Sequence, residues 1–171
     1  MYEKIREKRG FISDMDGVLY HGNNLLSGVP EFVNWLIENE KEFIFLTNSS
    51  ERTPQELSRK LKRMGLDVSA EHFYTSALAT AEFLAAQNPG CSAYVIGEAG
   101  LVNALYDEGI DMNDVNPEYV IVGDTRTYNF EKIEKAIALV NKGAKLIGTN
   151  PDITGPTENG IMPATGALIS P

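Results

Sequence analysis

The sequence has few of the residues that form covalent cross-links or soft-metal sites. Cys91 is the only cysteine among 171 residues, and His21 and His72 are the only histidines. An intrachain disulfide is therefore excluded, and these three residues are too few and too scattered for a metal cluster. We expect a reduced, cytoplasmic setting, an inert Cys91 and a structural His72.

Long apolar runs and an excess of basic residues are also missing. No apolar stretch approaches the roughly 20 residues that a membrane-spanning helix needs. Residues 1–9 alternate charges, so we expect no signal peptide there. The 24 acidic residues outnumber the 15 basic ones, giving a formal charge of -9. Because nucleic-acid binders present a basic face, we expect a protein with neither a nucleic-acid nor a membrane partner.

Strand and helix patterns alternate along the chain, which is typical of parallel sheets covered by helices. The expected strands cover residues 11–15, 43–46, 93–96, 119–122 and 145–147. The expected helices cover residues 30–39, 54–64, 76–86, 101–106 and 130–140, and the tail is loop- or hairpin-like. We therefore expect an α/β fold in two units, with a seam near residues 76–89.

An acidic pair lies at the carboxyl end of the first expected strand. In Asp14-Met15-Asp16-Gly17 the two carboxylates are two residues apart, and a strand places such residues on one side. Open α/β sheets bind ligands at the carboxyl ends of their strands. Two close carboxylates repel each other unless a cation compensates them, and Mg²⁺ prefers such oxygen ligands. One carboxylate could then attack a phosphate ester, while the other acts as general acid and base.

Two other interpretations compete for this acidic segment. It could be a simple acidic turn, and the tetrapeptide alone leaves that alternative open. A calcium loop of the EF-hand kind needs a glutamate at position 12. Counting from Asp14, that position is Leu25, so the calcium interpretation fails.

A second polar segment, Thr47-Asn48-Ser49-Ser50, follows the expected strand 43–46. A hydroxyl and free backbone N–H groups at a strand end can hold a phosphoryl group as charge moves onto its oxygens. In isolation, a polar loop before a helix is the commoner role for such residues. Its position favours the functional interpretation, because two strands joined by one crossover helix become neighbours and their ends converge.

These motifs resemble a known family. Residues 11–19 (FISDMDGVL) and Leu46-Thr47-Asn48 resemble the first and second signature motifs of the haloacid dehalogenase superfamily. The spacing, together with TSA at 75–77, YVIVG at 119–123 and TNPD at 149–152, is similar to its NagD-type, class IIA phosphatases. The resemblance implies a Rossmann-like core, begun by residues 1–77, and an inserted α/β cap of the C2 type at residues 78–171.

The resemblance also implies roles for the residues of both polar segments. Asp14 would be the nucleophile and a Mg²⁺ ligand, and Asp16 the general acid and base, whose backbone carbonyl also binds the metal. Thr47 and Asn48 would bind the transferring phosphoryl group. The implied activity is Mg²⁺-dependent hydrolysis of small phosphate monoesters, such as a nucleotide monophosphate or a sugar phosphate, through an aspartyl-phosphate.

The same resemblance bears on a loop of the expected cap. Asn150 and Asp152 fall in a loop that faces the substrate in this family, so a role in substrate specificity is expected. A simple turn is the alternative, because Asn-Pro-Asp suits one. Asp124 follows an expected strand as an acidic metal motif would, but its segment aligns with the cap instead.

The sequence departs from the family beyond the cap. The family carries there a lysine that steadies the nucleophile and an acidic motif that completes the magnesium site, and neither is visible before Pro171. We therefore expect a truncated chain. The alternative to an enzyme is a catalytically incompetent phosphate-binding or interaction protein with the same fold. A shortened sheet has an open edge, so we expect a homo-oligomer or association with a missing part.

Overall fold

The structure is a computed structural model that describes residues 2–157 and 160–171. The chain forms two compact units, a first unit of Met1–Thr47 and Pro54–Tyr74 and a second unit of Asn48–Thr53 and Thr75–Pro171. Each unit is a mixed α/β structure built on a parallel sheet, which confirms the expected fold class. The boundary expected after residue 77 falls inside the helix α4 (Ser76–Gln87).

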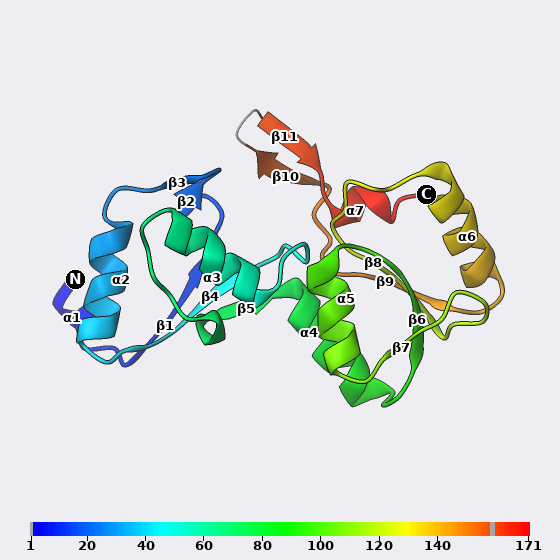
Figure 1. The fold of residues 1–171 in the computed structure, drawn as a ribbon, viewed down its shortest axis with the longest axis horizontal. Helices are drawn as coiled ribbons and strands as arrows, with labels where there is room; N and C mark the ends of the chain where they lie inside the picture. Colours follow the sequence, from blue (N-terminus) through cyan, green and yellow to red (C-terminus); the bar gives the residue numbers. More distant parts are fainter. Residues whose placement is uncertain (1, 158–159) are drawn as a thin grey trace. The chain divides into compact units, whose positions relative to one another are not determined.

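The first unit follows the predicted strand–helix–strand–helix order (Figure 1). Its elements are α1 (Tyr2–Arg6), β1 (Gly10–Asp14), β2 (Tyr20–His21), β3 (Asn24–Leu25), α2 (Val29–Glu38), β4 (Glu42–Thr47), α3 (Pro54–Arg63), the 3-10 turn η1 (Ala70–His72) and β5 (Phe73–Thr75). The main sheet has the order β1-β4-β5, with β1 and β4 parallel. The crossover helix α2 therefore joins two neighbouring strands, as the sequence predicts.

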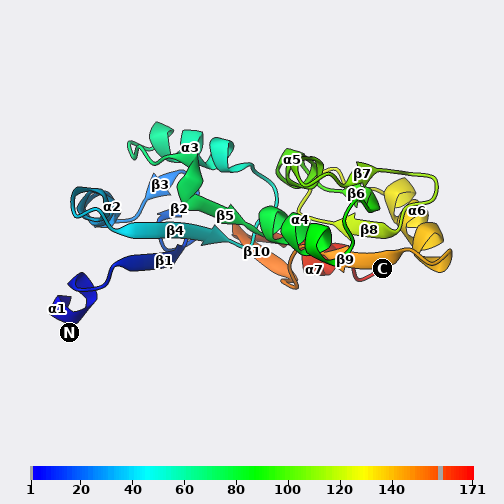
Figure 2. The same ribbon diagram turned by 90° about the horizontal axis from the view of Figure 1, so that it is seen from below.

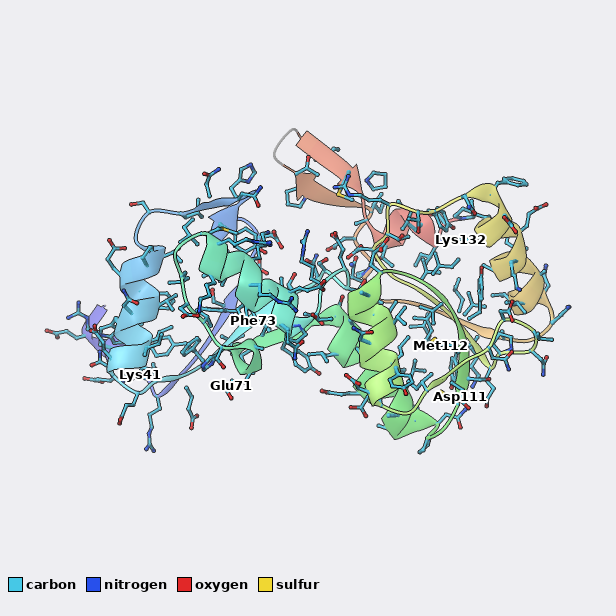
Figure 3. The ribbon with its side chains drawn as sticks, in the orientation of Figure 1. Lys41, Glu71, Phe73, Asp111, Met112 and Lys132 are labelled. Atoms are coloured by element: carbon cyan, nitrogen blue, oxygen red, sulfur yellow. The ribbon has the colours of Figure 1, made fainter. Side chains whose placement is uncertain are left out.

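The sheet of the first unit has one buried and one exposed face. Phe43 and Phe45 of β4 are 7% and 1% exposed, whereas Ile44 between them is 36% exposed. Helices α2 and α3 supply the covering side chains, which are Val33, Leu36, Leu57 and Leu61. Figure 2 shows α3 on one side of β4 and β5. Phe73, labelled in Figure 3, joins this core with its ring centroid 5.9 Å from that of Phe45.

The second unit contains the remaining helices and strands of the described chain. They are α4, β6 (Ser92–Ile96), α5 (Ala99–Asp107), β7 (Asp111–Met112), β8 (Tyr119–Val122), α6 (Phe130–Asn141), β9 (Lys145–Gly148), β10 (Thr154–Thr157), β11 (Gly160–Pro163) and α7 (Thr165–Leu168). A parallel sheet has the order β7-β6-β8-β9, and β10 and β11 form an antiparallel hairpin. The three helices predicted for this unit, α4, α5 and α6, are present, and each is slightly longer than expected.

Both faces of this second sheet are covered by helices (Figure 1). Tyr119 and Ile121 of β8 pack with side chains of α4 and α5, whereas Val120 and Val122 pack with α6 and α7. Side-chain caps begin two of these helices. The Thr75 hydroxyl accepts a hydrogen bond from the Leu78 amide at 3.2 Å in α4, and α6 has a similar cap. A strand that is buried on both faces explains the uninterrupted apolar run in the sequence.

None of the helices in the described part of the chain is both long and apolar enough to cross a lipid bilayer.

Candidate active site

The two predicted catalytic carboxylates flank a residue that anchors them to the core. Met15 is fully buried in the core of the first unit, whereas Asp14 and Asp16 on either side are exposed. The alternation therefore turns both carboxylates out of the core at the carboxyl end of β1. Within residues 2–157 and 160–171, neither carboxylate has a hydrogen-bond or ion-pair partner.

A tight turn holds the backbone directly after this pair. The Gly17 amide donates to the Tyr20 carbonyl at 2.8 Å, and the Leu19 amide donates to the Met15 carbonyl at 2.8 Å. Gly17 has a φ of 79°, which glycine adopts without the steric penalty of a side chain. Since Leu19 and Tyr20 are themselves buried, the turn fixes the exit of the chain from β1.

The predicted phosphate-binding threonine ends the neighbouring strand. In the parallel pairing of β1 and β4, Asp14 lies opposite Leu46. Thr47 is the next residue, the last of β4, and it is 7% exposed. Parallel strands end at the same edge of their sheet, so the carboxylates and Thr47 gather at one edge of the first unit. The convergence predicted from the sequence is therefore present.

The donor set at this edge suits a hard divalent cation. Among the described residues, no group of three or more histidine, cysteine, aspartate or glutamate side chains could hold a metal ion. Asp14 and Asp16 thus supply two carboxylates and no third acidic partner. Mg²⁺ is commonly bound through one or two carboxylates, with waters and substrate phosphate oxygens completing its octahedron. The chemistry of the pair fits Mg²⁺.

Asn48 belongs to the second unit, although it follows Thr47 directly in the chain. Its backbone carbonyl accepts hydrogen bonds from the Ser76 hydroxyl and from the Asn150 side-chain amide, each at 2.8 Å. Its own side-chain amide donates to an oxygen of Asp152. The structure therefore brings together three predicted residues, Asn48, Asn150 and Asp152, whose contact the sequence did not predict.

A buried network that the sequence does not predict holds the loop of residues 48–53. Ser50 is fully buried, and its amide donates to Asp124 Oδ2 at 3.1 Å. The Asp124 amide in turn donates to the Ser50 hydroxyl at 2.9 Å. The other Asp124 oxygen accepts from the amide and hydroxyl of Thr165, at 3.2 and 2.8 Å. No local pattern in the sequence signals these contacts between segments far apart in the chain.

His72 and Cys91 have structural surroundings. The His72 ring stacks on Phe43 with 3.8 Å between ring centroids, and its Nδ1 lies 2.9 Å from the Phe43 carbonyl oxygen. Cys91 is 1% exposed. The pKa of the Cys91 thiol is raised mainly by burial and to a lesser degree by the negative charge of Glu118. A raised pKa disfavours the reactive thiolate. These observations agree with the roles predicted for both residues.

Comparisons with known proteins point to one family. A sequence profile described as haloacid dehalogenase-like hydrolase matches residues 11–111, more than half of the chain. A dihydroxyacetone phosphatase of Corynebacterium glutamicum is 49% identical over 92% of this chain and 58% of its own length. The ribonucleotide monophosphatase NagD of Escherichia coli is 44% identical over 94% of this chain and 62% of its own.

The fold has similar solved structures. A 4-nitrophenylphosphatase from Thermotoga maritima superposes with a TM-score of 0.91 at 34% identity, covering 97% of this chain and 64% of the other. This chain therefore spans about three fifths of the length of these relatives.

Proposed function

Because this chain belongs to the haloacid dehalogenase-like hydrolases, we propose that it acts in the Mg²⁺-dependent hydrolysis of small phosphate monoesters through an aspartyl-phosphate on Asp14. The observation that carries the proposal is the gathering of Asp14, Asp16 and Thr47 at one edge of a parallel sheet. The phosphatase names of the similar proteins support the reaction class.

The two carboxylates have different tasks in the proposed reaction. An Asp14 oxygen attacks phosphorus, the bond from phosphorus to the ester oxygen breaks, and protonated Asp16 gives its proton to the leaving oxygen. Asp16 then takes a proton from water as the water oxygen attacks the phosphorus of the aspartyl-phosphate. This second step releases inorganic phosphate, restores the Asp14 carboxylate and returns Asp16 to its protonated form.

The phosphoryl oxygens need positive or hydrogen-bonding partners throughout both steps. Thr47 and the adjoining Asn48 are the proposed donors, since a hydroxyl and an amide can follow the charge as it shifts between oxygens. Mg²⁺ held by oxygens of Asp14 and Asp16 would offset the negative charge that the carboxylates and the phosphate bring together.

The proposed substrates are small phosphorylated metabolites, such as a nucleotide monophosphate or a sugar phosphate. Two of the similar proteins are named for dihydroxyacetone phosphate and ribonucleotide monophosphate chemistry, which supports this class without choosing within it. The role in substrate specificity expected for Asn150 and Asp152 stays a prediction.

A binding protein without turnover is the second candidate. Two carboxylates with no third acidic partner among the described residues favour it. Such a protein would bind inorganic phosphate with Mg²⁺ yet release none from an ester.

The release of 4-nitrophenol from 4-nitrophenyl phosphate tests the proposal. We expect release that requires Mg²⁺, stops when EDTA is added and is abolished by Asp14→Asn. Asp111→Asn is the matched control, because Asp111 is an exposed aspartate of β7 in the second unit (Figure 3). No release by the wild-type protein, or release that survives Asp14→Asn, would overturn the proposed enzyme.

A further inference from the structure

The loop of residues 150–152 is a rigid part of the second unit. Asn150 is 8% exposed, and its Oδ1 accepts a hydrogen bond from the Asp152 amide at 2.9 Å. The Asp152 carbonyl accepts from the Gly166 amide at 2.7 Å. A Cβ on Gly166 would lie 2.2 Å from the Pro151 carbonyl oxygen, so α7 packs directly against this loop. The loop thus presents its side chains from a fixed backbone.

This loop binds both the backbone and the side chain of Asn48. The Asn150 amide group donates to the Asn48 backbone carbonyl at 2.8 Å, alongside the Ser76 hydroxyl at 2.8 Å. The Asp152 carboxylate accepts a hydrogen bond from the Asn48 side-chain amide. One exposed asparagine is therefore restrained in its main chain and in its side chain by the same loop.

We propose that Asp152, with Asn150, is a positioning residue that fixes the orientation of the Asn48 side chain within the second unit, an inference that rests on the proposed phosphate-binding role of Asn48. An ionised carboxylate can only accept hydrogen bonds, so it selects the NH₂ side of the Asn48 amide. An NH₂ group carries two N–H bonds. The one not bonded to Asp152 is then held in a fixed direction relative to the loop of residues 150–152, and it is the N–H that the proposed function assigns to a phosphoryl oxygen.

This role differs from the substrate-specificity role in what it predicts. A positioning residue acts on the phosphoryl group, which every substrate shares. Its loss should lower kcat/KM by the same factor for 4-nitrophenyl phosphate and for dihydroxyacetone phosphate. A residue that contacts the remainder of the substrate would instead change the ratio between the two.

A neutral replacement at position 152 tests whether the side-chain oxygen that accepts from Asn48 is what matters. Asparagine keeps a side-chain oxygen that accepts from Asn48, whereas alanine keeps none. We expect Asp152→Ala to lower kcat/KM about 10- to 100-fold, the size of one hydrogen bond to a charged group. Asp152→Asn should recover part of that loss, because its neutral oxygen still accepts from Asn48 but makes a weaker hydrogen bond. Asp107→Ala, at an exposed aspartate of α5 in the same unit, is the matched control and should change nothing.

A second readout does not depend on turnover. The side-chain NH₂ signals of Asn48, identified by their loss in Asn48→Asp, can be followed in nitrogen–proton correlation spectra. We expect Asp152→Ala to shift these signals and Asp152→Asn to shift them less. Absence of wild-type turnover would defeat the proposed function, while these spectra would still decide the positioning.

The positioning role would be overturned by any of three results. One is that Asp152→Ala does not shift the side-chain NH₂ signals of Asn48. Another is a loss of kcat/KM that falls on one substrate alone. The third is an Asp152→Asn variant as impaired as Asp152→Ala, since that result would assign the effect to the charge rather than to the acceptor.

Discussion

Replacing Asp124 with alanine should make the second unit unfold more readily, because the Asp124 carboxylate joins three segments of the chain. It accepts from the Ser50 amide at 3.1 Å and from the amide and hydroxyl of Thr165 at 3.2 and 2.8 Å. Ser50 and Thr165 are both fully buried, so water cannot readily replace the lost acceptor. The loop of residues 48–53 and the start of α7 would lose their shared attachment.

The size of the effect can be worked out from the unsatisfied donors. Each buried donor without a partner costs about 1–3 kcal/mol, and Asp124→Ala leaves the amides of Ser50 and Thr165 in that state. Because the three hydrogen bonds share one carboxylate and are not additive, we expect a loss of about 3–5 kcal/mol in the free energy of unfolding. With a urea dependence of about 2 kcal/mol per molar, the midpoint should fall by roughly 1.5–2.5 M.

Urea unfolding followed by circular dichroism, with hydrogen exchange at the Ser50 amide, measures this loss. Trp35, the only tryptophan, lies in the first unit, so its fluorescence reports that unit separately. Asp114→Ala is the control, since Asp114 pairs with Lys135 at 2.7 Å on the surface and should matter far less. Equal midpoints for the two variants would refute the reasoning, as would Mg²⁺ binding that depends on Asp124.

Three further predictions concern packing, reactivity and association. Gly100→Ala places a methyl group 2.6 Å from the Ser50 carbonyl oxygen. This close contact should lower the free energy of unfolding by about 1–3 kcal/mol, while the better helix propensity of alanine should offset about 1 kcal/mol of that loss. The control is Gly10→Ala, whose nearest contact is 3.9 Å, and equal stability of the two variants would contradict the packing argument. Cys91 should resist alkylation until urea is added, since it is buried and its pKa is raised. Rapid alkylation of the native protein would contradict this prediction. Because the folded pKa of the thiol is raised, the free energy of unfolding should be greatest below the ordinary thiol pKa and should fall as the pH rises through the folded pKa. The chain should self-associate at high concentration by light scattering, and Ile12→Gln, at a residue 76% exposed on β1, should reduce this. A clean wild-type monomer would count against it.

Sequence periodicity predicted the longer helices and strands because their buried residues recur at a regular spacing within a short stretch of sequence. The apolar run of β8 and the helical spacing in α2 both reflect residues that face a core. The acidic pair was predictable for the same reason. Asp14 and Asp16 lie two residues apart around Met15, so strand alternation alone indicates that they share a side.

Short elements and long-range contacts were not predictable in this way. β5 was missed because Phe73–Thr75 is too short to show a period, and its pairing with the sheet supplies its stability. Residues 48–53 belong to the second unit, where hydrogen bonds join Asn48 to Asn150 and Asp152, about a hundred positions away in the chain. No pattern within a sequence window contains that information.

Asp14 and Asp124 show why position after a strand is insufficient evidence for chemistry. Asp14 ends the strand β1 and Asp124 lies two residues after β8, and both positions are typical of metal-binding aspartates. Asp124 accepts hydrogen bonds from backbone and side-chain donors of its own unit, so its lone pairs are already used in holding the loop of residues 48–53.

Within the described residues, Asp14 and Asp16 have no such partners and are exposed. A bound cation would offset the negative charge that these two carboxylates bring to one edge of the sheet. The unsatisfied pair is therefore the one that retains capacity for a metal ion and a substrate. The satisfied carboxylate instead stabilises the segment that carries Asn48.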